Sequence, residues 1–202
     1  MSLILDTLFS ANTVTATIRV LTLLVFGTMA AVINVTSGIN NIGIEGIFLS
    51  SALVAVLGSW LTQSWILGML LAVLWGVALS LLFGYLTMKL GTNNILCGLA
   101  LNMFASGGTV FVLSAVTGQK GSSISLASKV APRFSIPLLK EIPYIKVLFT
   151  DYSFFTYLAI AVVIFVVIMI KRTPIGLRIR AVGLNPNAAS SVGINVRTVR
   201  YT

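Results

Sequence analysis

The sequence predicts an all-α protein, a polytopic bundle of about five transmembrane helices followed by short helices at the C-terminus. Two observations predict this fold class. First, 57% of the 202 residues are apolar and 8% are charged, whereas a soluble domain averages about 25% charged residues. Second, uncharged runs of 25, 43 and 30 residues follow Arg19, Glu45 and Lys89. A helix needs roughly 20 apolar residues to cross a bilayer, and continuous rather than alternating runs favour helices over strands.

The boundaries of five spans follow from these runs and from a fourth uncharged run, Tyr152 to Ile170. The 43-residue run must hold two helices, and Trp60 and Trp65 flank its break around Ser59–Ser64 as interface anchors. The predicted spans are Ile18–Val35, Gly46–Trp60, Trp65–Met88, Ile95–Val116 and Phe154–Ile170. The chain then divides into an N-terminal segment (1–17), a transmembrane domain (18–170) and a C-terminal segment (171–202).

The reactive side chains argue against an enzyme. The sequence has no histidine, one cysteine and four carboxylates, so a nucleophile activated by imidazole is excluded, as is a metal site of histidines and cysteines. No phosphate-binding G-x-x-x-x-G-K-[ST] loop occurs. We therefore expect no catalytic residue, no metal and no cofactor. Basic loops on the cytoplasmic and lipid side explain the net charge of +9 better than nucleic-acid binding does.

Two segments are expected outside the membrane besides the C-terminal tail. Residues 1–17 form either a frayed terminus or one interfacial turn. Residues 118–151 form the longest loop, in which Pro132, Pro137 and Pro143 disfavour long helices. This loop is either a packed connection or a docking surface for a partner.

The first polar stretch between spans is Asn34–Gly46, which places Asn40, Asn41 and Glu45 among three glycines. Irregular polar backbone at membrane depth is tolerated where it lines a cavity or is buried in protein. A carboxylate within the membrane is a functional candidate by default. The alternative is an ordinary loop at the membrane face with a solvated Glu45.

A second polar stretch opens the fourth predicted span. Thr92 is expected to cap the helix, and Asn94, Gly98 and Asn102 recur every four residues on one face. Such a stripe is either a helix–helix contact or the wall of a polar path.

The C-terminal tail contains two start signals and two stop signals. Thr173-Pro174 and Asn185-Pro186 each predict a helix start, and Gly183 and Gly193 predict the two helix ends. The second helix is expected to expose Ala188, Ala189 and Val192 on one side. A small amphipathic helix of this kind suits docking into a groove of a soluble partner, or lies on anionic lipid.

Three motifs in this order resemble the permease subunits of ABC importers, in the branch that moves nucleosides and simple sugars. They are Asn41-Ile-Gly-Ile-Glu-Gly46, Gly98-Leu-Ala-Leu-Asn102, and the tail from Gly176 to Ala189 with Gly193-Ile-Asn-Val. The resemblance covers residue 18 to the end. It implies a multi-pass inner-membrane (plasma-membrane) subunit that works with ABC ATPase subunits, a second permease subunit and an extracytoplasmic substrate-binding lipoprotein.

The resemblance also assigns orientation and candidate residues. Basic residues divide seven against six between the two sides, which does not decide a topology. The resemblance places residues 171–202 in the cytoplasm as a coupling segment and residues 118–151 outside. The candidate substrate path comprises Asn40, Asn41, Glu45, Asn94 and Asn102. The candidate residues for ATPase coupling are Gly176, Arg178, Arg180, Gly183, Asn185, Ala188, Ala189, Val192 and Gly193.

This sequence departs from the family pattern in two places. Asn34-Val-Thr-Ser-Gly38 lacks the two charges that relatives commonly carry before the asparagine-isoleucine-glycine motif. The family's permeases also continue with further helices, so we expect this chain to be a fragment or a truncated product. Two other readings remain open: a stand-alone secondary transporter or channel with Glu45 as coupling residue, or a non-transporting membrane assembly subunit.

Overall fold

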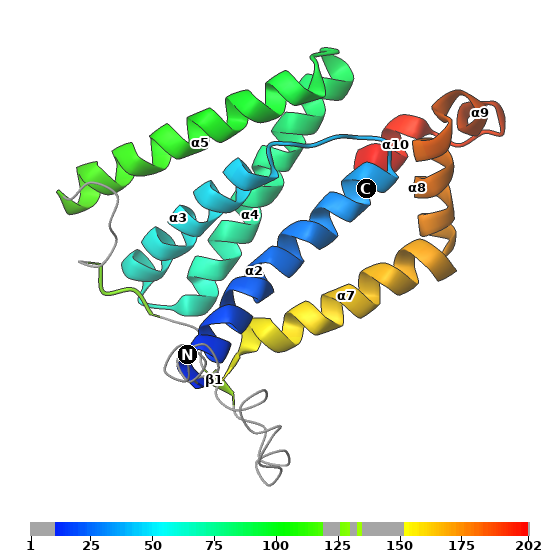
Figure 1. Cartoon of the computed structure of the whole chain (residues 1–202). Helices are drawn as coiled ribbons and strands as arrows, with labels where there is room; N and C mark the ends of the chain where they lie inside the picture. The colour runs from blue at the N-terminus through cyan, green and yellow to red at the C-terminus, as the bar shows by residue number, and fades with distance from the viewer. Residues whose placement is uncertain (1–10, 119–125, 130–132, 135–151, 202) are drawn as a thin grey trace, which may run out of the picture. The chain divides into compact units, whose positions relative to one another are not determined.

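The computed structural model describes residues 11–118, 126–129, 133–134 and 152–201 (Figure 1). The long helices are α2 (Ala11–Thr36), α3 (Ile44–Thr62), α4 (Trp65–Gly84), α5 (Asn94–Thr117) and α7 (Phe154–Arg172). A π-helical segment, η1 (Tyr85–Lys89), continues α4, and the tail forms α8 (Pro174–Leu184), α9 (Pro186–Ser191) and α10 (Val196–Tyr201). Among the described residues, β-structure is confined to β1 (Arg133–Phe134) and β2 (Tyr152–Ser153). The predicted all-α class is confirmed.

Five helical stretches in the described residues are long and apolar enough to cross a membrane. Two of them, beginning at Trp65 and Phe154, start where the sequence predicts. The largest difference is in α2, which begins at Ala11, seven residues before the predicted Ile18. Thr17 fits this first part of the helix because its hydroxyl bonds to the helix backbone: Thr17 Oγ1 donates to the Thr13 carbonyl at 2.8 Å.

The chain forms two compact units, and both include parts of α2 and α7. The first unit comprises residues 1–29 and 131–168. In it, Thr22 Oγ1 lies 3.3 Å from Thr156 Oγ1 and joins α2 to α7, while Ala159 and Val166 are buried seven residues apart on one face of α7. The strands pair antiparallel, with Arg133 opposite Ser153.

The second unit contains α3, α4 and α5 (Figure 1). α3 and α4 form an antiparallel pair around a turn at Gln63, which has φ 51°. Close approach of their backbones rests on two glycines: a Cβ at Gly58 would lie 3.2 Å from the Cα of Gly68, and a Cβ at Gly68 would lie 2.7 Å from the Ala55 carbonyl oxygen. Small residues at such crossings are typical of helix packing in membranes, where no hydrophobic driving force brings helices together.

A buried apolar cluster marks the end of this unit at which α3 and α5 begin. Ile39, Phe83 and Leu101 form the cluster, with Ile47, Met88 and Cys97 packed against it. The π-helical turn η1 begins two residues after Phe83, at Tyr85, and its i→i+5 bonding is seen in the Leu90 N–H, which donates to the Tyr85 carbonyl. Single π-helical turns occur frequently at functional sites.

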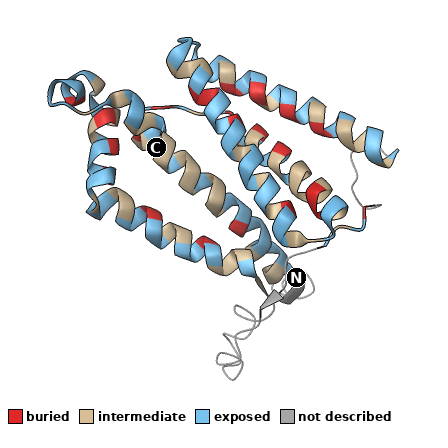
Figure 2. Cartoon of the chain, turned by 180° about the vertical axis from the view of Figure 1, so that it is seen from behind, coloured by how far each residue is buried: buried red, intermediate tan, exposed pale blue. Residues whose placement is uncertain are grey.

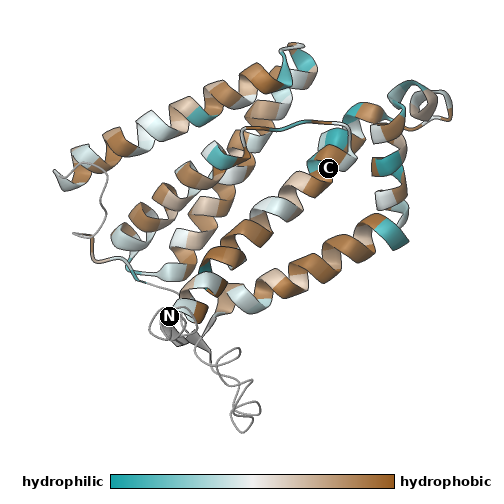
Figure 3. Cartoon of the chain, in the orientation of Figure 1, coloured by the Kyte–Doolittle hydropathy of each residue, from teal (hydrophilic) through white to brown (hydrophobic). Residues whose placement is uncertain are grey.

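Most of the surface of the long helices is apolar and exposed. Leu74 of α4 is 65% exposed and Phe104 of α5 is 71% exposed, and exposed positions dominate these helices in Figure 2. Figure 3 shows hydrophobic colouring along α4 and α7 and more hydrophilic positions in α8 and α9. An apolar exterior of this extent suits lipid, because a soluble monomer rarely exposes so large a contiguous apolar patch.

Candidate functional site

Asn102 connects α5 to the beginning of α3. α3 begins after Gly43, whose missing side chain leaves the first N–H groups of the helix without a local cap. The Asn102 side chain takes this role from another helix: Gly46 N–H donates to its Oδ1 at 2.7 Å. In return, Asn102 Nδ2 donates to the Ile42 carbonyl at 3.0 Å. Both ends of the amide are therefore engaged in joining two membrane helices.

Glycines make this α3–α5 contact geometrically accessible. A Cβ at Gly98 would lie 2.7 Å from the Gly43 nitrogen, and a Cβ at Gly46 would lie 2.9 Å from the Cα of Asn102. Of the two interpretations of the stripe on α5, the structure supports a helix–helix contact for Gly98 and Asn102. Asn41 also has a local structural role, because its Oδ1 accepts the Gly43 N–H at 2.9 Å.

Two other candidate path residues, Asn40 and Asn94, line one cavity of about 600 Å³. Asn93 lines the same cavity, and its side chain accepts the N–H groups of Ile95 and Leu96. The expectation that Thr92 caps this helix is therefore wrong. An asparagine one position later does so, because its amide oxygen, with the residue in extended conformation, faces the first turn.

Glu45 lies in the first turn of α3, not in an irregular loop. Its side chain is exposed, and it is not among the residues that line the cavities containing Asn40 and Asn94. A carboxylate in the first turn interacts favourably with the positive end of the helix dipole. The structure therefore brings Asn40 and Asn94 together but places Glu45 apart from that cavity.

The tail begins with a tight reversal from α7 into α8. Thr173 is the cap, as predicted: Gly176 N–H donates to its Oγ1 at 3.2 Å, and Pro174 occupies the first turn. Gly176 is buried against the end of α7, since a Cβ there would collide with the Met169 carbonyl oxygen. Ile179 and Val182 continue this face and are 5% and 0% exposed.

Gly183 does not end α8, contrary to the expectation. The helix continues to Leu184, and Asn185 ends it while starting the next helix. Gly183 instead lies against the end of α2: a Cβ there would collide with the Thr36 carbonyl oxygen, and it would lie 3.2 Å from the Gly38 nitrogen. Close packing, rather than left-handed backbone, explains this glycine, because Gly183 is not among the residues with positive φ.

The short helix α9 starts and stops as predicted. Asn185 Oδ1 accepts the N–H groups of Asn187 and Ala188 at 3.1 Å. At the other end, Gly193 has φ 84°, and the Ile194 N–H donates to the Ala189 carbonyl at 3.1 Å. This pattern is a Schellman motif.

The exposed face of α9 differs from the predicted one. Ala189 is 4% exposed and faces inward, so it is wrong to count it with the exposed residues. Ala188 is exposed, and Val192, just beyond the helix, is 75% exposed. Arg178 and Arg180 are also exposed. The reason for the error is that α9 has barely two turns, so one side of it must cover α8 and α10.

Sequence reasoning missed three features of the described structure. Leu184, the last residue of α8, is 89% exposed, but it was not included in the docking face. Gly58 and Gly68 lie five residues on either side of the Gln63 turn, and that symmetry is a usable signal for a contact in a helical hairpin. Arg200 has a buried Nε without a hydrogen-bond partner among the described residues, and no local sequence pattern predicts this burial.

Comparisons with known proteins agree with the predicted resemblance. Residues 13–202 match a family model described as "Branched-chain amino acid transport system / permease component". The chain is 33% identical over 189 residues to the guanosine ABC transporter permease protein NupQ of Bacillus subtilis, covering 88% of this chain and 57% of that protein. It is 36% identical over 186 residues to the nucleoside ABC transporter permease protein NupC of Lactococcus lactis, with the same two coverages of 88% and 57%.

A more distant relative is archaeal. The chain is 27% identical over 202 residues to a putative glucose ABC transporter permease protein of Haloferax volcanii, covering 96% of this chain and 58% of that protein. This chain thus spans somewhat more than half the length of these curated relatives. No solved structure matches it. With five candidate spans and a family match over nearly its whole length, the chain is a multi-pass plasma-membrane protein that belongs to the family of ABC transport permease components.

Proposed function

We propose that this chain forms membrane-spanning helices of an ATP-driven importer for nucleosides or a related sugar-containing solute. ATP hydrolysis is done by separate ABC ATPase subunits, and a second permease subunit and an extracytoplasmic binding protein complete the system. Family membership and the names of the relatives support the transport class and the solute class.

The observation that carries the coupling role is the geometry of the α8–α9 segment. Its two most exposed apolar side chains, Leu184 and Val192, lie at the end of α8 and just beyond the end of α9. Exposed large apolar side chains on a helical segment that also carries arginines favour a groove on a protein partner. Arg178 and Arg180 are exposed on α8 and add attraction to acidic groups of that partner.

The buried face of α8 explains how docking affects the membrane helices. Gly176 lies against the last carbonyls of α7, and Gly183 lies against the last carbonyl of α2. Backbone-to-backbone contacts of this kind have no flexible side chain between them to absorb a displacement. A movement imposed on α8 by an ATPase subunit is therefore transmitted to the ends of two membrane helices.

The orientation follows from the same proposal. If α8 and α9 contact an ATPase, residues 171–202 are cytoplasmic. Helices α3 and α5 then begin at the cytoplasmic side, and residues 118–151 are extracytoplasmic. Of that loop, the described residues 126–129 pack on α3, where Ser59 Oγ donates to the Lys129 carbonyl at 2.9 Å and accepts the Lys129 N–H at 3.0 Å.

In this orientation, Asn40 and Asn94 line the cytoplasmic end of the substrate path. Amide side chains both donate and accept hydrogen bonds, as recognition of a nucleobase edge or a sugar hydroxyl requires. Glu45 does not line this cavity, but it is exposed in the first turn of α3 at the same end of the unit, where its charge acts on the path through the electrostatic field rather than by contact. Asn41 and Asn102 support the path indirectly, through the shape of the loop and the α3–α5 contact.

The proposed coupling is tested by co-purification of the chain with its cognate ATPase subunits from membranes. Replacing Leu184 or Val192 by Asp places a charge in the partner groove, and loss of a central apolar contact costs about 2 kcal/mol or more of binding. We therefore expect recovery of the ATPase to fall at least about tenfold. The matched control is Leu61→Asp, a 71% exposed leucine at the other end of α3.

Equal ATPase recovery for wild type, Leu184→Asp and Val192→Asp would contradict the docking role of this segment. A loss that Leu61→Asp shares would point to impaired membrane insertion instead. Solute uptake that persists without any ATPase subunit would contradict the importer class itself and favour a stand-alone transporter.

A further inference from the structure

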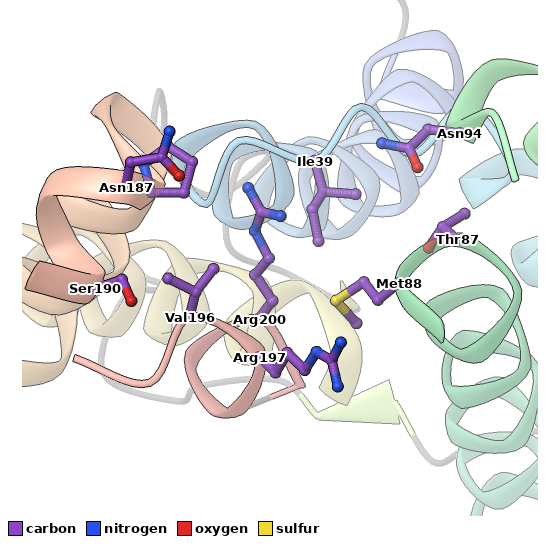
Figure 4. A pocket seen from close by; sticks show the side chains of 10 residues that line it. Ile39, Thr87, Met88, Asn94, Asn187, Ser190, Val196, Arg197 and Arg200 are labelled. Atoms are coloured by element: carbon purple, nitrogen blue, oxygen red, sulfur yellow. The ribbon is translucent and has the colours of Figure 1, made fainter. Parts of the chain in front are cut away.

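A second cavity, of about 400 Å³, lies where the tail meets the ends of the membrane helices. It is contained in the second compact unit. Figure 4 shows Arg197 and Arg200 extending from α10, with Asn187 and Ser190 of α9 on one side and Met88 and Thr87 of η1 on the other. The lining residues are Ile39, Thr87, Met88, Asn94, Pro186, Asn187, Ser190, Val196, Arg197 and Arg200.

The cavity concentrates positive charge that the described residues do not neutralise. Arg197 and Arg200 lie three residues apart and therefore on neighbouring turns of one face of α10. Glu45 is the sole carboxylate in the described ranges, and it is exposed and does not line the cavity. No side-chain hydrogen bond joins either arginine to another described residue of the cavity.

Arg200 is the stronger indication of a ligand. Its Nε is fully enclosed and has no hydrogen-bond partner among the described residues. A buried donor left unsatisfied costs about 1–3 kcal/mol, and an unpaired guanidinium in a partly enclosed site costs more than a neutral donor does. Native structures tolerate few such groups, and an absent ion or ligand is one of the standard explanations.

We propose that this cavity binds a phosphate group. Arginine presents a planar fork of donors that matches phosphate oxygens bidentately, and here two forks line one space. Asn187 and Ser190 add neutral donors, since both line the cavity and, within the described part of the chain, their side chains make no hydrogen bond. A site with two arginines, an amide and a hydroxyl provides several donors for the oxygens of a tetrahedral anion.

The depth of the cavity identifies two sources for that phosphate. Met88 lies one residue before the end of one candidate span, and Asn94 is the first residue of the next. The cavity therefore lies at the level where a bilayer presents its lipid phosphates. An anionic lipid headgroup and a soluble phosphate or phosphomonoester share the chemistry that this site recognises.

Occupancy of the site would join elements that belong to different parts of the tail and the bundle. The anion contacts α9, α10 and the π-helical turn η1 together, so it holds the proposed docking segment against the end of α4 and the start of α5. This role is independent of which solute is transported, and the site involves neither Leu184 nor Val192.

The test measures phosphate binding by the full chain purified in a neutral detergent. Titration calorimetry with inorganic phosphate compares wild type with Arg197→Gln and Arg200→Gln, and native mass spectrometry measures retained lipid after reconstitution in phosphatidylcholine with or without phosphatidylglycerol. Loss of one charge-assisted fork is expected to weaken phosphate binding about tenfold or more. Arg200→Lys keeps the charge and the fold but loses the fork, so its affinity should fall between those of wild type and Arg200→Gln.

The control is Lys171→Gln together with Arg172→Gln, which removes two positive charges at the end of α7, outside the cavity. Phosphate binding that depends on Arg197 and Arg200 but not on this pair supports the proposal. Additional arginine-dependent retention of phosphatidylglycerol identifies a lipid as the source, and its absence identifies a soluble anion. Equal phosphate and lipid binding by wild type and both Gln variants overturns the proposal. The proposal is also overturned if the chain does not bind phosphate but recovery of the ATPase requires both arginines. In that case the cavity binds a carboxylate of a protein partner.

Discussion

Replacement of Asn102 by Ala should loosen the contact between α3 and α5. The wild-type amide makes two hydrogen bonds between these helices, at 2.7 Å to the Gly46 N–H and at 3.0 Å from Nδ2 to the Ile42 carbonyl. Each contributes about 1 kcal/mol net, and the loss of a helix cap costs about 0.5–2 kcal/mol by itself. We expect Asn102→Ala to reduce the free energy of opening this contact by about 2 kcal/mol.

The single cysteine of the chain provides the assay. Cys97 lies on α5 and packs partly buried against the Ile39, Phe83 and Leu101 cluster, so a thiol reagent reaches it fully only when the helices separate. When closing is faster than labelling, the labelling rate follows the population of the open form. A loss of 2 kcal/mol then predicts labelling about 30-fold faster than in wild type.

Two further variants separate capping from a general loss of an amide. Asn102→Asp keeps an acceptor for Gly46 N–H but places a carboxylate oxygen against the Ile42 carbonyl, so its labelling rate should fall between wild type and Asn102→Ala. Asn40→Ala is the control, because Asn40 is exposed. If Asn102→Ala and Asn40→Ala labelled Cys97 at the same rate, Asn102 would not be joining the two helices.

Three other expectations can be measured independently. Gly98→Ala should destabilise the protein by about 1–3 kcal/mol through overpacking, because its Cβ would lie 2.7 Å from the Gly43 nitrogen. Gly107→Ala is the control: a Cβ there has nothing within 4 Å, so this variant should be neutral or stabilising by up to about 1 kcal/mol. Similar losses of stability for both variants in thermal denaturation in detergent would contradict the packing argument. In a Cys97→Ser background, a membrane-impermeant thiol reagent should label Thr62→Cys in intact cells but Ser190→Cys only after lysis, and the reverse pattern would invert the proposed orientation. Glu45→Gln should lower solute uptake by the reconstituted importer while changing stability by less than about 0.5 kcal/mol, as is usual at an exposed site; unchanged uptake would remove Glu45 from the path.

The sequence alone determined the class of the protein and the positions of its membrane helices. The length of an uncharged run indicates how many residues can lie in the hydrocarbon core of the bilayer. This number depends on local composition and not on tertiary contacts. The helix starts at Thr173-Pro174 and Asn185-Pro186 were equally accessible, because a cap bonds to N–H groups two or three residues away in the same chain. Gly193 follows the same rule, since positive φ at a helix end is a local requirement.

The tertiary structure decided what the polar and small residues on those helices do. The sequence does not distinguish a glycine that ends a helix from a glycine that lets a neighbouring backbone pack closely. Gly183 allows close packing, against the end of α2. The sequence also does not distinguish an amide side chain that lines a substrate path from one that caps another helix. Asn102 caps α3, although it lies 56 residues from Gly46 in the sequence. Ala189 turned inward and Arg200 was brought to a cavity for the same reason. Each outcome depends on which element lies opposite, and that partner is distant in the sequence, where no local pattern records it.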